Sequence, residues 1–154
     1  MGVFGMAASY LAFATLHFFQ FVLAITVCGL YGVDLSRASK AGVRSDSRWV
    51  YAEVVGALSA LTALLLMVPF FLRFAAVWVW NVVLFILWIA LFGVFASLFI
   101  HEDPEGNGDI QRMKNAVWVD LVNALLWLFT ALGHFVYWFR HRERVSRFTG
   151  RARV

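Results

Sequence analysis

Charged residues are scarce in this chain, and the few present are unevenly placed. They make up 14% of the 154 residues, against roughly 25% in a typical soluble domain. They fall into short clusters separated by long uncharged stretches, and 62% of all residues are apolar. This distribution keeps charge out of hydrocarbon, so it indicates an integral membrane protein and excludes an ordinary soluble domain.

Cysteine is scarcer still, and basic residues are missing from the start of the chain. Cys28 is the single cysteine, so four-span proteins that need paired extracellular cysteines are excluded. The first basic residue is Arg37, so the basic region that opens a signal peptide is lacking. We therefore expect the first apolar segment to remain as a membrane span.

Four segments are long and apolar enough to cross a hydrocarbon core about 30 Å thick, which takes about 20 helical residues. Continuous apolar runs favour helices over the alternating strands of a barrel. The predicted fold class is all-α, a four-helix transmembrane bundle with up-down-up-down topology and both ends on one side. We predict an N-terminal segment at 1–10, spans at 11–33, 50–72, 75–100 and 116–139, and a basic tail at 140–154.

The three predicted connections hold most of the other charges. A basic loop covers 34–49, a tight turn surrounds Arg73, and an acidic loop at 101–115 contains Pro104 and Gly106, which break helices. We expect that acidic loop to be solvated and to bind no metal. Seven bases lie on the side of the termini and six on the other, so their number hardly decides orientation. The density of the tail cluster favours cytosolic termini.

The tail is the most basic part of the chain. Its six arginines face one acid, Glu143, and they are Arg140, Arg142, Arg144, Arg147, Arg151 and Arg153. Bases beside a span attract anionic lipid, with about 1 kcal/mol for each residue near the surface. We predict anionic lipid as the partner and no nucleic acid, and a plain anchor that fixes topology is the alternative. Leu132, Tyr137 and Arg140 also satisfy a loose sterol-contact pattern.

Polar residues inside the spans are spaced three or four apart, which places them on single helix faces. One face carries His17, Gln20, Cys28 and Tyr31, with Ala24 completing the spacing, and the other carries Asp120, Asn123, Trp127, Thr130 and His134. We expect both faces to point into the bundle and to hydrogen-bond between helices. Two alternatives remain open: an ion or proton pathway that uses Asp120, or a haem ligated by His17 and His134.

Two further features concern helix packing. Glu53 and Asp120 lie in the first turns of their spans, where we expect them to pair with nearby bases such as Arg48, Arg112 or Lys114. The second span also carries a stripe of small residues that allows close approach, within the bundle or between protomers: Ala52, Gly56, Ala60 and Ala63.

Several ordered strings resemble fungal MARVEL-domain proteins. They are HFFQF at 17–21, GLYGVD at 29–34, WVYAEV at 49–54 and IQRMKNAVWVD at 110–120. The resemblance covers about 9–140. It implies a four-span bundle with cytosolic ends and a role in membrane apposition, vesicle trafficking or sterol- and sphingolipid-rich domains. It supplies no catalytic residues.

The sequence thus favours a non-enzymatic membrane organiser, in the plasma membrane or an endomembrane, that needs no cofactor. Its partners would be membrane lipids and like subunits in a homo-oligomer. A small channel or transporter and a haem-binding redox protein are the rival hypotheses.

Overall fold

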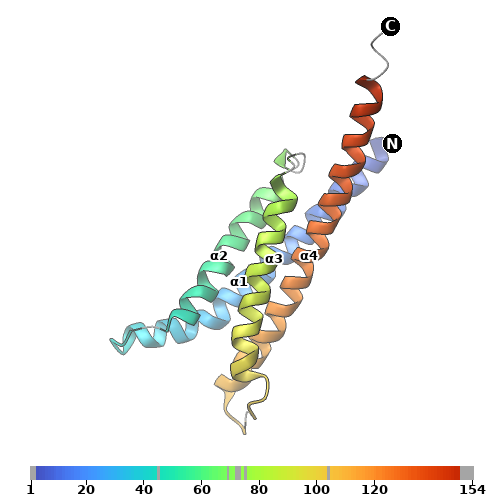
Figure 1. The fold of residues 1–154 in the computed structure, drawn as a ribbon. Helices are drawn as coiled ribbons and strands as arrows, with labels where there is room; N and C mark the ends of the chain where they lie inside the picture. The colour runs from blue at the N-terminus through green and yellow to red at the C-terminus, as the bar shows by residue number, and fades with distance from the viewer. Residues whose placement is uncertain are drawn as a thin grey trace.

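The computed structural model of the protein describes residues 3–44, 46–68, 70–71, 74, 76–103 and 105–149. These residues form four helices and no strand (Figure 1). Each helix contains a stretch long and apolar enough to cross a membrane. The predicted all-α, four-helix fold is confirmed, and the protein is an integral multi-pass membrane protein. The helices are α1 (Val3–Lys40), α2 (Ser47–Leu66), α3 (Ala76–Phe99) and α4 (Gly108–Thr149).

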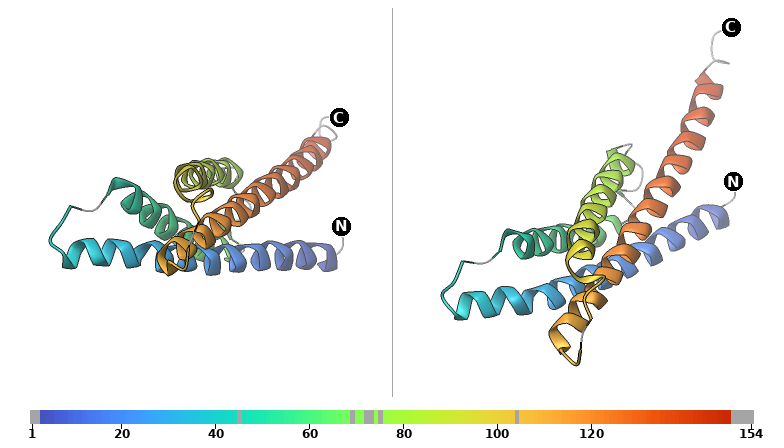
Figure 2. Two further views of the ribbon diagram at one scale, coloured as in Figure 1. Left: turned by 90° about the horizontal axis from the view of Figure 1, so that it is seen from below. Right: turned by 60° about the horizontal axis from the view of Figure 1, so that its bottom comes forward.

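The helices pack as successive antiparallel neighbours, and α4 closes the bundle against α1. Contact is most extensive within the α1–α2 and α3–α4 pairs. Both termini lie at the same end (Figure 1). Figure 2 shows that α1 and α4 are inclined to each other and that the C-terminal part of α4 continues beyond the other helices. Positions 140–149 of the predicted tail are therefore a helical extension of the last span.

Two helices run further than the predicted spans. α1 continues to Lys40 instead of ending at 33, and α4 begins at Gly108 instead of 116. The reason is that loss of apolar character marks where a chain leaves hydrocarbon, whereas a helix ends where its backbone is capped. Most of the predicted loop at 34–49 and half of the one at 101–115 are consequently helical.

The true end of α1 has a recognisable cap. Gly42 adopts a positive φ of 64°, its N–H donates to Ser39 O at 3.1 Å, and the Val43 N–H donates to Ala38 O at 3.1 Å. These two bonds form the Schellman motif, which favours glycine at the left-handed position.

Side-chain caps set the starts of α2 and α4. Asp46 Oδ1 accepts from the Arg48 N–H at 2.9 Å, and Asn107 Oδ1 accepts from the Asp109 N–H at 3.0 Å. α2 ends at Leu66 and not at 72, because a proline at 69 disfavours helical backbone just before it. The predicted turn residue Arg73 and the tail residues Arg151 and Arg153 lie outside the described residues.

The small residues of α2 face the inside of the bundle. Ala52, Gly56, Ala60 and Ala63 are all buried. A Cβ placed on Gly56 would lie 2.6 Å from Cys28 Sγ and 3.4 Å from Ala24 O of α1. Close approach of α1 and α2 therefore requires glycine here, and the stripe serves packing within the bundle instead of forming an exposed face.

Candidate functional site

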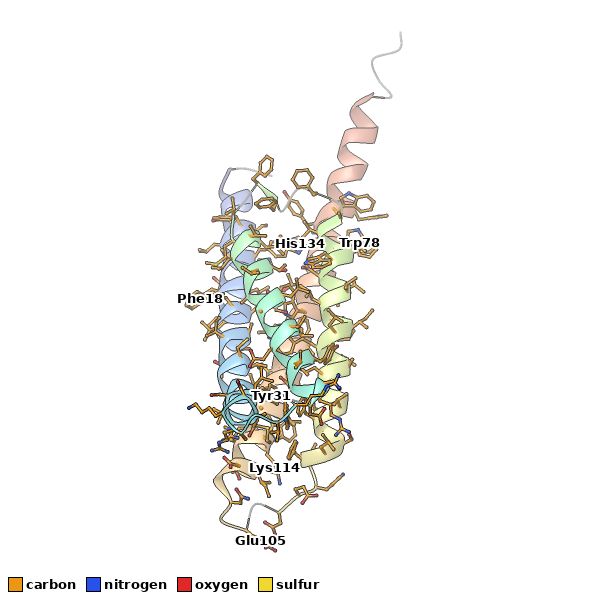
Figure 3. The ribbon with its side chains drawn as sticks, turned by 90° about the vertical axis from the view of Figure 1, so that its left-hand side faces the viewer. Phe18, Tyr31, Trp78, Glu105, Lys114 and His134 are labelled. Atoms are coloured by element: carbon orange, nitrogen blue, oxygen red, sulfur yellow. The ribbon has the colours of Figure 1, made fainter. Side chains whose placement is uncertain are left out.

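Polar side chains line the interior from one end of the α1–α4 contact to the other. We call this set the polar seam: His17, Gln20 and Tyr31 of α1, Asn81 of α3, and Asp120, Asn123, Trp127, Thr130 and His134 of α4. Every member is at most 3% exposed. The α4 members extend over about 21 Å of helix axis, at a rise of 1.5 Å per residue. Figure 3 shows Tyr31 and His134 towards opposite ends of the bundle.

Gln20 joins α1 to α4 and fixes the hydrogen on His17. Gln20 Nε2 donates to Thr130 Oγ1 at 2.9 Å, and the Thr130 hydroxyl donates to Leu126 O at 2.7 Å. The other Gln20 atom, Oε1, then faces His17 Nδ1 at 2.7 Å. An amide oxygen can only accept, so His17 carries its hydrogen on Nδ1 and presents Nε2 as a bare acceptor.

His134 is held by a different set of partners. Its Nδ1 lies 2.9 Å from the Asn81 side-chain nitrogen and 3.1 Å from Thr130 O. Nδ1 either accepts from the Asn81 nitrogen or donates to the Thr130 carbonyl oxygen, so the two contacts require opposite tautomers and fix neither. The ring stacks on Phe13 with 4.2 Å between centroids, and its centroid is 5.9 Å from that of His17. The two imidazoles thus lie next to each other in the same buried region.

The facing histidines do not fit a haem. A porphyrin between them would separate α1 from α4, but the 2.9 Å bond from Gln20 to Thr130 ties these helices together next to the two rings. The Phe13 ring already covers one face of His134. Within the described part of the chain, no group of three or more His, Cys, Asp or Glu side chains could hold a metal ion.

Asp120 is paired with a phenol. Its Oδ2 accepts a 2.6 Å hydrogen bond from the Tyr31 hydroxyl. The Tyr31 ring packs against Phe95 and Trp49, with centroid separations of 4.3 and 5.8 Å. The expected pairing of Asp120 with a base is wrong, because Arg112 lies two helical turns away and binds other acids.

Those acids form an ionic cluster at the end of the bundle opposite the termini. Arg112 binds both Asp34 carboxylate oxygens at 3.0 Å and contacts Asp109 at 2.5 Å, and Arg37 contacts Asp109 at 2.6 Å. The cluster joins α1 to α4 beyond their apolar sections. There, Arg37 and then Arg112 hold the pKa of the exposed Asp109 carboxyl below its usual value, because they stabilise its charged form.

Glu53 also departs from the expected pairing with a base. It is half-buried, and its Oε1 is buried without a hydrogen-bond partner among the described protein atoms. The bases expected beside it bind elsewhere, since Arg48 pairs with Asp46 at 3.9 Å and Lys114 donates to Glu102 O at 2.9 Å. Glu53 instead lines an open groove of about 620 Å³ between α1 and α2, with Cys28, Gly32, Leu35, Ser36, Ser39 and Val50.

The predicted lipid-contact residues lie at the other end. Leu132 and Arg140 are exposed, and Tyr137 is half-buried with its ring against Phe13. Arg142, Arg144 and Arg147 belong to the helical extension of α4, and their side chains lie outside the described part.

Asn81 is the member of the polar seam that the sequence analysis missed. Its signal was an amide side chain in a third span that is otherwise almost entirely apolar. A single polar residue has no spacing to analyse, so only the packing of α3 on α4 reveals its partner.

Comparison of the chain with protein-family models, with curated proteins and with solved structures finds no significant match.

Proposed function

We propose that this multi-pass membrane protein is a non-enzymatic organiser of membrane domains, membrane apposition or vesicle trafficking. It acts through contacts of its outer surface with lipid and with like subunits. The proposal places it in the plasma membrane or an endomembrane with cytosolic termini, and includes membership of the fungal MARVEL-domain family, on the strings quoted above.

The observation that carries the proposal is the division between surface and interior. Large apolar side chains are exposed on all four helices, including Ile25 at 50%, Leu61 at 63%, Ile86 at 57% and Phe129 at 59%. The intramembrane His, Asp and Asn side chains are buried. Such an exterior suits lateral contact with acyl chains and with other membrane proteins.

The helical extension of α4 adds a second type of contact. Positions 140, 144 and 147 recur at the spacing of one helix face, and each is arginine. Because this extension continues directly from a membrane span, its bases lie where the headgroups of anionic lipid are found. Charge thus adds lipid selectivity to a surface that is otherwise apolar.

Native mass spectrometry of the full chain released from nanodiscs tests the proposal. The nanodiscs should contain neutral and anionic phospholipid with sterol. We expect a defined oligomer that retains anionic lipid or sterol. The triple variant Arg140→Gln, Arg144→Gln, Arg147→Gln should lose the enrichment of anionic lipid, since about 1 kcal/mol per base corresponds to roughly fivefold for each.

A matched control removes three bases from the opposite end, as Lys40→Gln, Arg44→Gln and Arg48→Gln. This variant should keep the enrichment that depends on the tail. A bare monomer that retains no lipid would refute the organiser hypothesis. Equal loss of anionic lipid in both triple variants would refute the specific role of the α4 extension.

A further inference from the structure

The polar seam contains more buried polar atoms than its own hydrogen bonds satisfy. Seven of its side-chain atoms have no partner among the described protein atoms: His17 Nε2, Asn81 Oδ1, Asp120 Oδ1, Asn123 Nδ2 and Oδ1, Trp127 Nε1 and His134 Nε2. Polar groups buried in proteins are almost always hydrogen-bonded, to protein or to ordered water. Seven exceptions in one region of one bundle therefore indicate additional hydrogen-bonding molecules.

These atoms have the chemistry that water requires. His17 Nε2 and Asp120 Oδ1 accept, Trp127 Nε1 donates, and Asn123 does both. A buried water typically makes about three hydrogen bonds to such groups. The seven atoms include both donors and acceptors, a mixture that water can satisfy because it donates and accepts. An anion would be repelled by the acceptors, and an apolar ligand would satisfy none.

The unpartnered atoms also lie at successive depths along the bundle axis. Along α4 they occur at Asp120, Asn123, Trp127 and His134, and Thr130 fills the one longer interval. Neighbouring positions in this series are about 4.5–6 Å apart along the axis. They cover about 21 Å of a hydrocarbon core about 30 Å thick.

Both ends of this series approach polar surroundings. Tyr31, bound to Asp120, is followed one turn later by Asp34 of the ionic cluster. At the other end, His134 lies six residues before Arg140, which is exposed. The stretch of helix between each end of the polar seam and the nearest polar end of the bundle is therefore short.

We propose that the polar seam holds a file of internal water and conducts protons across the membrane between the Asp120–Tyr31 pair and the His17–His134 pair. Although the sequence presents a proton pathway as an alternative to the organiser, the two functions use different parts of the molecule, the interior and the outer surface, and one chain can carry both. Each transfer consists of one proton gained and one released. Bare His17 Nε2 takes a proton from a hydronium in the file, which becomes water, and releases it to the next water, which becomes hydronium, while Gln20 keeps the Nδ1 hydrogen in place. Asp120 Oδ1 exchanges a proton with water in the same way, and no electron transfer is involved.

Proton flux into proteoliposomes tests the proposal. The purified full chain is reconstituted with a trapped pH-sensitive dye, and a potassium gradient with valinomycin supplies the driving potential. We expect internal pH to change faster than in protein-free liposomes. Asn123→Leu should lower the flux at least about tenfold, since it removes both hydrogen-bonding atoms from the middle of the file and adds about 1.4 kcal/mol or more to the barrier.

Asn123→Leu is informative because it should not harm the fold. Its amide has no partner among the described protein atoms, so a leucine of similar shape should leave the melting temperature unchanged or higher. Asp120→Asn should also lower the flux. The control Asp103→Asn changes an exposed loop acid, and should conduct like the unmodified protein. Flux equal to that of protein-free liposomes would overturn the proposal, as would flux that Asn123→Leu and Asp120→Asn leave unchanged.

Discussion

At the scale of single residues, the Tyr31–Asp120 pair illustrates how polar groups are tolerated inside this bundle. The 2.6 Å bond uses the Tyr31 hydroxyl and one carboxylate oxygen, and aromatic rings surround the phenol. Measured hydrogen bonds between membrane helices average about 0.6 kcal/mol. The gain from forming such a bond is small, but a buried donor left without a partner costs about 1–3 kcal/mol.

We therefore predict that Asp120→Leu destabilises the bundle by about 1–2 kcal/mol, because the Tyr31 hydroxyl is left without an acceptor. Reversible unfolding in mixed detergent micelles, followed by circular dichroism, measures this change. Adding Tyr31→Phe to Asp120→Leu should restore part of the loss, since the unpaired hydroxyl is removed. A double variant less stable than Asp120→Leu alone would show that the two side chains are not coupled in this way.

At the scale of helices, contact between α1 and α2 depends on the absence of a side chain at Gly56. A Cβ there would lie 2.6 Å from Cys28 Sγ and 3.4 Å from a backbone oxygen of α1. We predict that Gly56→Ala lowers the free energy of unfolding by about 1–3 kcal/mol, the usual effect of overpacking. The same micelle unfolding assay measures it.

Gly93 provides a matched control for this prediction. It also lies within a helix, but a Cβ there would have no neighbour within 4 Å. Gly93→Ala should therefore be neutral or stabilising by up to about 1 kcal/mol. Since the nearest atom to a Cβ at 56 belongs to Cys28, Cys28→Ala should rescue Gly56→Ala. Failure of this rescue would locate the strain in the backbone contact with Ala24 instead.

The sequence predicts some properties of these helices better than others. The number of spans, the buried faces of α1 and α4 and the small-residue face of α2 all follow from composition and a period of 3.6. The helix ends do not, because the cap at Gly42 and the proline at 69 act on the backbone and leave no mark in hydropathy. Partners across the bundle are also hidden. That Arg112 binds Asp34 and leaves Asp120 to Tyr31 depends on how α1 and α4 are inclined.

At the scale of the whole molecule, the bundle is polar at both ends but in different ways. The end opposite the termini is held by the ionic cluster, in which Arg112 and Asp34 are only 18% and 22% exposed. Charges at that end bind one another across helices. The end with the termini carries the helical extension of α4, which continues beyond the other helices (Figure 2). One end therefore stabilises the fold, and the other is available to the membrane surface.

This difference leads to a prediction about a chain truncated after Phe139. The bundle should fold as before, since positions 140–149 continue α4 beyond the other helices (Figure 2), and its melting temperature in detergent should be unchanged. Its orientation in the membrane should change. The full chain has seven bases on the side of the termini and six on the other. Truncation leaves one base on the side of the termini and six on the other. Because bases are retained on the cytosolic side, the truncated chain should insert with its N-terminus outside. Protease protection of an N-terminal epitope tag in intact membranes measures the orientation of both chains.

Substituting all six tail arginines by lysine should preserve the original orientation, because the charge is kept. A truncated chain that unfolds in detergent would contradict the division between fold and tail, and one that inserts like the full chain would show that the tail charges do not set topology.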